Sequence, residues 1–355
     1  MECRPKSATG GGKTRAPNTA ATDGANATSS TQRPPLIVIV GATATGKTAQ
    51  ALTLARQIGG ALIGADSVQI YRELDIGSAK PTAAELGGIE HHLISALPPD
   101  AAIDAAAYAR MADAAIRAAW ARGKPPVVVG GTGLWLRALL RGLVQLPPVD
   151  PDLRAHLLAE AEHVGAAKLH ARLQRVDPVA AGRIHPHDTQ RLVRALEVYQ
   201  QCGQPLGRLQ DAHRLGVPRY RAWVWRLERP AEQLRARIAA RLQTMVAAGW
   251  VAEVQALVAR YGPDLRALRS VGYRQLVAHV EGQCDLATAL ARAQKATWIY
   301  AKQQRRWFRH EPAADWPRAG GPSPVQVSPA GAAPSATLRT AVDAFLADAA
   351  PICDA

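Results

Sequence analysis

The sequence predicts an α/β fold: a P-loop doubly wound parallel sheet flanked by helices, with a helical insertion domain. Three observations support this. A continuously apolar, β-branched run at 36–40 leads into a glycine loop, as a buried parallel strand would. Strand-like and helix-like runs then alternate to about residue 142, which favours a sheet with ligands at the carboxyl ends of its strands. Beyond residue 143 the chain is helical and rich in Arg and His until a strand-like run at 221–227.

The alternating region contains two further strand signals. Residues 61–67 form a strand that ends at Asp66, and 125–133 form a buried strand that runs into a glycine turn. An Ala-rich helix at 104–122 is expected between them. Along the whole chain five segments are predicted: a disordered N-terminal tail (1–33), the first part of the core (34–142), a helical insertion domain (143–220), the second part of the core with basic aromatic helices (221–313) and a flexible C-terminal tail (314–355) with a short helix near 337–349.

The formal net charge of +14 favours a polyanionic partner, and nucleic acid is the first candidate; a solvated Arg-rich face is the alternative. The four cysteines are far apart and form no C-x-x-C pair. They indicate a reducing compartment without structural zinc, and a cytoplasmic protein is expected. No stretch has the apolar length of a membrane span. No self-complementary apolar patch is evident, so a monomer is expected.

Residues 41–48 match G-x-x-x-x-G-K-[ST], the loop that wraps backbone N–H groups around a polyphosphate. Lys47 is expected to contact phosphate oxygens, Thr48 to help hold Mg²⁺, and the Thr43 hydroxyl to face a phosphate. The predicted phosphate-binding residues are Gly41, Ala42, Thr43, Ala44, Thr45, Gly46, Lys47 and Thr48.

Asp66 ends the second strand, where a P-loop fold faces its acceptor substrate. Two interpretations stay open: a carboxylate that accepts a proton from an attacking group, or an N-cap, with Ser67, of a following helix. The strand at 125–133 ends in Gly130-Gly131-Thr132-Gly133 and lacks the acid with which P-loop ATPases commonly hold magnesium. That difference weakens a hydrolase interpretation.

Two basic segments favour RNA. After Asp188 a helix is expected to present Arg191 and Arg194 on one face, suited to phosphates or simply to solvent. Residues 291–310 carry six Lys or Arg, no acid, and interleaved aromatic rings, a pattern typical of single-stranded RNA binding, although some of the rings must belong to the core.

Seven segments, GATATGKT, DSVQIYRELDIGSAKP, HHL, GGTGLW, DPVAAGRIHPHDTQRLVRALEV, RSVGYRQ and TWIYAKQQRRWF, resemble the tRNA dimethylallyltransferases, in the family's order and over most of 36–310. The resemblance implies transfer of a dimethylallyl group from its diphosphate to the exocyclic amine of the adenosine 3′ of the anticodon, giving N6-isopentenyladenosine and diphosphate. Mg²⁺, tRNA and dimethylallyl diphosphate are the implied cofactor and partners, and the target base is expected to flip into a channel.

By the same resemblance, Asp66 is the general base, Arg237 the catalytic arginine, and Thr43 and Thr132 further catalytic residues. The insertion is expected to contact tRNA. The implied tRNA-binding residues are Asp66, Ser67, Val68, Gln69, Thr132, Arg154, Gln190, Arg191, Leu192, Val193, Arg194, Arg269, Ser270, Val271, Gly272, Tyr273 and Arg274.

The chain departs from the family pattern at Ala42, Trp135, His187 and Gln303, in place of proline, tyrosine, asparagine and arginine. Trp135 is expected to alter the shape of the channel, and Gln303 removes one positive charge. Three alternatives remain. A P-loop small-molecule kinase would not need the basic insertion, an adenylate isopentenyltransferase would not need the basic aromatic segment, and a non-catalytic RNA-binding protein would leave Lys47 and Asp66 without a role.

Overall fold

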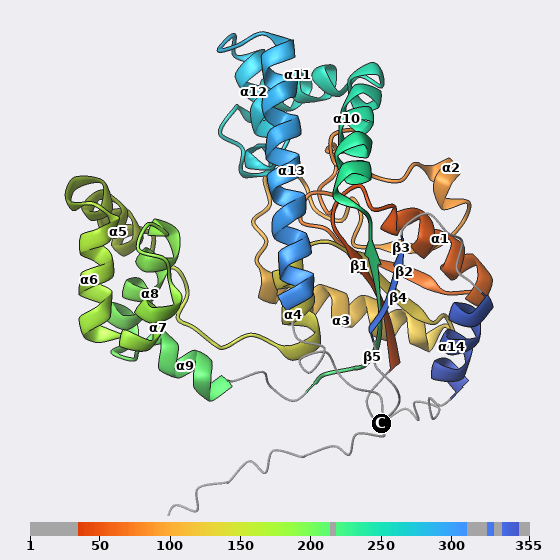
Figure 1. The fold of residues 1–355 in the computed structure, drawn as a ribbon, viewed down its shortest axis with the longest axis horizontal. Coiled ribbons are helices and arrows are strands. Elements are labelled where there is room, and N and C mark those ends of the chain that lie inside the picture. The colour runs from red at the N-terminus through yellow and green to blue at the C-terminus, as the bar shows by residue number, and fades with distance from the viewer. Residues whose placement is uncertain (1–34, 214–217, 311–324, 330–335, 348–355) are drawn as a thin grey trace, which may run out of the picture.

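The computed structural model describes residues 35–213, 218–310, 325–329 and 336–347. Across these ranges the strands form one sheet in the order β3-β2-β4-β1-β5-β6, and every neighbouring pair is parallel. The α/β fold with a parallel sheet is therefore confirmed (Figure 1). The strands are β1 (Pro35–Gly41), β2 (Ala61–Ala65), β3 (His91–His92), β4 (Pro126–Gly130), β5 (Arg221–Glu228) and β6 (Val325–Pro329).

Strand β1 lies between β4 and β5 and is buried along its whole length. Successive side chains of a strand point to opposite faces. Leu36, Val38 and Val40 accordingly belong to one apolar cluster, and Ile37 and Ile39 to another. Because each face has its own core, the strand is apolar at every position, which explains the unbroken run in the sequence.

Helices cover both faces of the sheet. The larger cluster includes residues of α3, α4 and α10 to α13, whereas the smaller one includes residues of α1 and α14. The bounds are α1 (Lys47–Ile58), α2 (Ala83–Leu86), α3 (Ala105–Ala121), α4 (Gly133–Arg141), α10 (Ala231–Ala247), α11 (Trp250–Tyr261), the 3₁₀ turn η2 (Arg266–Arg269), α12 (Tyr273–Val280), α13 (Leu286–His310) and α14 (Ala336–Ala347).

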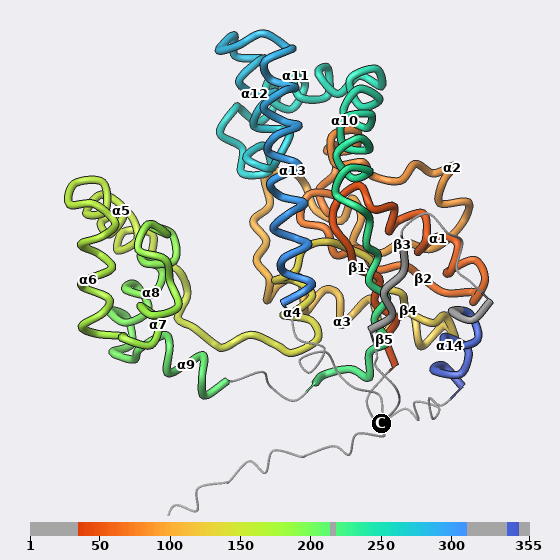
Figure 2. Tube along the Cα trace, in the orientation of Figure 1, coloured from red at the N-terminus to blue at the C-terminus, as the bar shows by residue number. Residues whose placement is uncertain are grey.

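The segment predicted as an insertion contains a separate helical group with an apolar core of its own, which includes Leu157, Leu169, Leu192 and Leu196. Figures 1 and 2 show this group set apart from the sheet. Its helices are α5 (Pro151–Val164), α6 (Ala166–Val176), α7 (Pro178–Arg183), α8 (Thr189–Cys202) and α9 (Leu206–His213).

Two parts of the segment predicted as a flexible C-terminal tail are ordered secondary structure. Strand β6 pairs in parallel with β5, and α14, close to the helix expected at 337–349, buries Val342 and Phe345 in the smaller cluster. Arg339 also donates to the Gln57 carbonyl at 2.9 Å. The sequence analysis expected the helix but not strand β6, because local composition does not reveal a strand that completes a sheet edge. The predicted disordered tail at 1–33 lies outside the described residues.

No single helix within the described ranges is long and apolar enough to cross a membrane; α10 and α11 pass that test only together, and they meet at a bend of 65°.

Candidate active site

The loop at residues 41–48 joins β1 to α1. Ala44 and Gly46 have φ angles of 62° and 93°, so the chain turns twice through the left-handed region that favours glycine. The Thr45 hydroxyl closes the turn by donating to the Ala42 carbonyl at 2.8 Å. Helix α1 starts at Lys47 without a side-chain cap, so its first N–H groups are available to an anion. The local geometry suits the predicted phosphate site.

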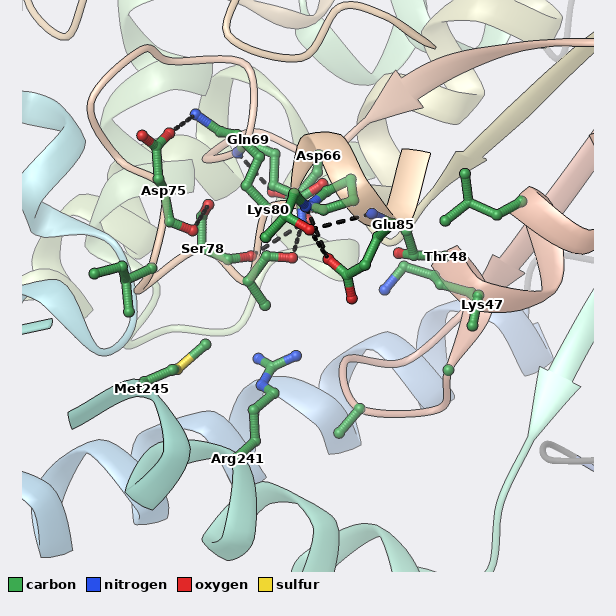
Figure 3. Close-up of a pocket in the computed structure, with 18 of the residues that line it drawn as sticks. Lys47, Thr48, Asp66, Gln69, Asp75, Ser78, Lys80, Glu85, Arg241 and Met245 are labelled. Atoms are coloured by element: carbon green, nitrogen blue, oxygen red, sulfur yellow. Dashed lines mark hydrogen bonds and ion pairs between the residues drawn. The ribbon is translucent and has the colours of Figure 1, made fainter. Parts of the chain in front are cut away.

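This loop borders a cavity of about 1280 Å³. Its walls come from α1, from the residues that follow β2 and from α10. Figure 3 shows Lys47 and Thr48 on one side of the cavity and Arg241 across from them. Among the predicted site residues, those that line the cavity are Thr43, Ala44, Gly46, Lys47, Thr48, Asp66, Gln69 and Arg237.

Lys47 is enclosed, and burial lowers the pKa of its ammonium group, whereas the negative charge of Asp66 acts in the opposite direction. Burial also lowers the pKa of Arg241, and Asp66 again opposes that shift. Two desolvated cations thus share one carboxylate. Such a site favours a polyanion, because one carboxylate does not neutralise two buried cations and an incoming diphosphate would supply the missing negative charge.

Asp66 follows β2 directly. Its Oδ1 accepts the backbone N–H groups of Val68 at 2.9 Å and Gln69 at 3.2 Å, as a cap would, but residues 67–70 form a turn and not the helix that the capping interpretation expected. Neither bond uses Oδ2, and the residue lines the cavity. The two interpretations left open by the sequence are therefore compatible, because the bonds that order the turn use one carboxylate oxygen of a residue that lines the cavity.

The glycine turn after β4 packs against the residues on either side of this acid, Ala65 and Ser67. A side chain at Gly130 would overlap the backbone of Ala65, so only glycine allows the close approach. The Thr132 hydroxyl accepts the Ser67 N–H at 3.1 Å. The Tyr300 hydroxyl of α13 is hydrogen-bonded with Thr132, and burial raises its pKa. Thr132 is thus held against the turn that follows Asp66, but it is not among the residues that line the cavity.

Gln304 of α13 joins the two glycine loops and was not predicted. Its Oε1 accepts the N–H of Thr43 at 2.7 Å, and its Nε2 donates to the Gly131 carbonyl at 2.9 Å. The side chain is 6% exposed. Both polar ends of a buried amide are therefore used, and the spacing between the P-loop and the turn at 130–133 depends on it.

Two arginines of α10 approach the P-loop. Arg237 Nε donates to the Ala44 carbonyl at 2.9 Å, and Arg241 Nη2 donates to the Thr43 hydroxyl at 3.0 Å. Because they are four residues apart, they share one helix face. The sequence analysis singled out Arg237 and missed Arg241, which no motif distinguishes. The structure brings Arg241 to the Thr43 hydroxyl and Arg237 to the Ala44 carbonyl, and both arginines line the cavity.

Two of the residues that depart from the family pattern, Trp135 and Gln303, differ in burial. The Trp135 ring is buried and stacks on Tyr108 at 4.3 Å, so it belongs to the core. The expectation that it shapes a channel is therefore wrong for this conformation. Gln303 is exposed, next to the buried Gln304.

The predicted RNA contacts of the insertion fall into two groups. Arg191 has a side chain 70% exposed and free to reach a phosphate, with Asp188 at 3.4 Å. Arg194 and Arg154 instead pair with the fully buried Glu197, at 3.1 Å and 3.4 Å. Those two arginines stabilise a buried carboxylate, which needs partners, so Arg191 carries the more available charge.

Three predicted contacts have fully buried side chains: Leu192, Val193 and Tyr273 are 0% exposed. They pack in the cores of the insertion and of the α10–α13 region, and their side chains offer no surface to RNA. Within the same segments, Arg269 is exposed beside Asp264, and Arg274 is exposed. The remaining predicted contacts are Ser67, Val68 and Gln69 next to the cavity, Gln190 on α8, and Ser270, Val271 and Gly272 before α12.

Residues 69–311 match the family model described as IPP transferase. The chain is 47% identical over 281 residues to the tRNA dimethylallyltransferase of Anaeromyxobacter dehalogenans strain 2CP-1, an alignment that covers 79% of this chain and 92% of that protein.

Solved structures agree with this match. A tRNA delta(2)-isopentenylpyrophosphate transferase from Staphylococcus epidermidis is 30% identical, with a TM-score of 0.62 over 89% of this chain and 100% of that one. A eukaryotic dimethylallyltransferase acting on tRNA is 25% identical, with a TM-score of 0.65 over 78% of this chain and 70% of that one. The chain therefore belongs to the IPP transferase family.

Proposed function

We propose that this protein transfers a dimethylallyl group from dimethylallyl diphosphate to the exocyclic amine of the adenosine 3′ of the anticodon in tRNA. The observation that carries the proposal is a single cavity that joins an open phosphate-binding loop to the carboxylate of Asp66. A donor diphosphate and an acceptor amine fit these two ends. The family relatives, named tRNA dimethylallyltransferase, support the substrate class.

The chemistry divides between the two ends of the cavity. The adenine amine is a weak nucleophile because its lone pair is delocalised into the ring. As the nitrogen bonds to the allylic carbon, the carbon–oxygen bond to diphosphate breaks and the amine proton passes to Asp66 Oδ2. Negative charge grows on the leaving diphosphate. Lys47 and Arg241 meet that charge, and Arg237 holds the loop that binds it.

Mg²⁺ fits this site as a cofactor bound largely through the substrate. Within the described residues no group of three or more His, Cys, Asp or Glu side chains could hold a metal. Thr48 and Asp66 line the same cavity, and so sparse a protein donor set suits an ion that keeps phosphate and water ligands. When bound, Mg²⁺ would offset diphosphate charge, with the Thr48 hydroxyl as its protein ligand.

Transfer of the labelled prenyl group tests the proposal. The protein is incubated with Mg²⁺, labelled dimethylallyl diphosphate, and either unmodified tRNA or AMP. Label in tRNA supports the proposal. Label in AMP alone would assign the chain to nucleotide prenylation. In a parallel incubation with ATP in place of the prenyl donor, phosphate transfer together with no label in either acceptor would indicate a kinase.

A further inference from the structure

The carboxylate of Glu253, on α11, receives four hydrogen bonds. Its Oε2 accepts the backbone N–H groups of Asp75 at 2.9 Å and Ile76 at 2.6 Å. Its Oε1 accepts the N–H of Gly77 at 3.1 Å and the hydroxyl of Tyr273 at 2.7 Å. Three successive N–H groups around one carboxylate form an anion-binding concavity, and each bond is charge-assisted.

Close packing at Gly77 reinforces these bonds. A side chain at this position would overlap both the Trp250 indole and the Tyr273 ring. Those two rings lie edge to face, with centroids 5.9 Å apart, and both are buried. The loop at 75–77 is thus pressed against α11 and α12, and only glycine allows the approach.

Hydrogen bonds continue from this loop to the proposed base. Ser78 and Ala79 accept from the Gln69 side-chain amide at 2.9 Å and 3.0 Å. The Gln69 backbone N–H in turn donates to Asp66 Oδ1 at 3.2 Å. Ser78, Ala79, Gln69 and Asp66 all line the cavity. An unbroken series of contacts therefore runs from Tyr273 to the carboxylate that would accept the proton.

We propose that Glu253 is a positioning residue for prenyl transfer. It holds the loop at 75–80 against the segment at 269–274, and this loop, through Gln69, sets the orientation of Asp66. The inference rests on the proposed function for the role of Asp66, and on the sequence prediction that the segment at 269–274 binds tRNA. The Glu253 carboxylate accepts hydrogen bonds both from the backbone of 75–77 and from Tyr273. RNA bound at 269–274 would therefore restrain the cavity wall through this carboxylate.

Hydrogen–deuterium exchange of the full-length protein tests the contact without any reaction. In Glu253→Ala the amides of 75–77 are expected to exchange at least about tenfold faster than in the wild type. Glu281→Ala, which changes an exposed acid directly after α12, is the matched control and is expected to change nothing there. Unchanged exchange in Glu253→Ala would overturn the proposal. Unmodified tRNA is expected to slow this exchange further in the wild type but not in Glu253→Ala, and equal slowing would refute the link to 269–274.

Kinetics separate positioning from mere stability. Glu253→Ala is expected to lower kcat about 10- to 100-fold while the KM for tRNA changes less than about threefold, since only the geometry of the base is lost. Glu253→Gln keeps one oxygen acceptor and is expected to give intermediate kcat and exchange. Gly77→Ala is expected to copy the kcat loss by displacing the same loop. A raised KM with normal kcat would refute positioning. Absence of prenyl transfer in the wild type would reject the proposed function, whereas the exchange result would still stand.

Discussion

Replacing Asp66 by asparagine isolates proton transfer from loop structure. Asparagine is nearly isosteric, and its carbonyl oxygen can take the place of Oδ1 in accepting the Val68 and Gln69 N–H groups. What the change removes is the second oxygen and the negative charge. The turn after β2 is expected to persist, because two hydrogen bonds of about 1 kcal/mol each are retained.

The expected loss of rate follows from that difference. General base catalysis contributes roughly 10²- to 10⁴-fold, which corresponds to about 3–5 kcal/mol in the activation free energy. Loss of the carboxylate also removes the interaction that raises the Lys47 pKa against burial. The diphosphate end of the cavity is thus affected secondarily, and donor binding is expected to change in the same assay.

Single-turnover transfer from labelled dimethylallyl diphosphate to unmodified tRNA, with tRNA binding measured separately, provides the assay. Asp66→Asn is expected to bind tRNA with unchanged affinity and unfold at the wild-type temperature. Asp104→Asn is the matched control, because Asp104 likewise accepts a backbone N–H, at 2.7 Å from Ala107, but does not line the cavity. A rate for Asp66→Asn within about threefold of the wild type would show that the proton leaves by another route.

Three further changes test the surroundings. Arg241→Gln is expected to lower kcat about 10²- to 10³-fold with tRNA affinity retained, and a larger loss in Arg237→Gln would reverse their assigned roles. Arg191→Ala is expected to reduce the salt dependence of tRNA binding by about one unit of slope, unlike the control Arg110→Ala on α3; equal slopes would mean a solvated face. Burial lowers the pKa of His91 to about 4, so the folded state resists a proton that the unfolded chain takes up below about pH 6.5. The free energy of unfolding is therefore expected to fall as pH drops from 6.5 towards 4. Between pH 7 and 4.5, urea unfolding should show a fall about 2 kcal/mol smaller for His91→Met than for the wild type. An equal fall in the two proteins would contradict this.

Features set by neighbouring residues were predictable. The P-loop follows from a motif, a strand and a helix start within fourteen residues, and the position of Asp66 follows from the end of the next strand. These elements appear where the sequence predicts them because burial pattern and backbone chemistry are local properties.

Features that depend on distant segments were not predictable. Gln304 meets Thr43 across 261 residues, and Arg241 meets the same threonine across 198. Neither side chain stands out by periodicity, since an amide in a basic helix and an arginine four places after another are both ordinary on a solvated face. Only the packing of α10 and α13 against the loop distinguishes them.

The end of β4 explains why this P-loop suits an allylic diphosphate better than a nucleotide to be hydrolysed. An acid at that strand end would hold the metal of an ATPase. Here Gly130 instead closes on Ala65, which lets Thr132 bond the backbone after β2 and Tyr300 bond Thr132. The carboxylate of the site comes from the neighbouring strand, at Asp66, and shares the cavity with the phosphate loop. Because the acid belongs to the acceptor side of the cavity, the same cradle can neutralise a departing diphosphate while the proton leaves an amine.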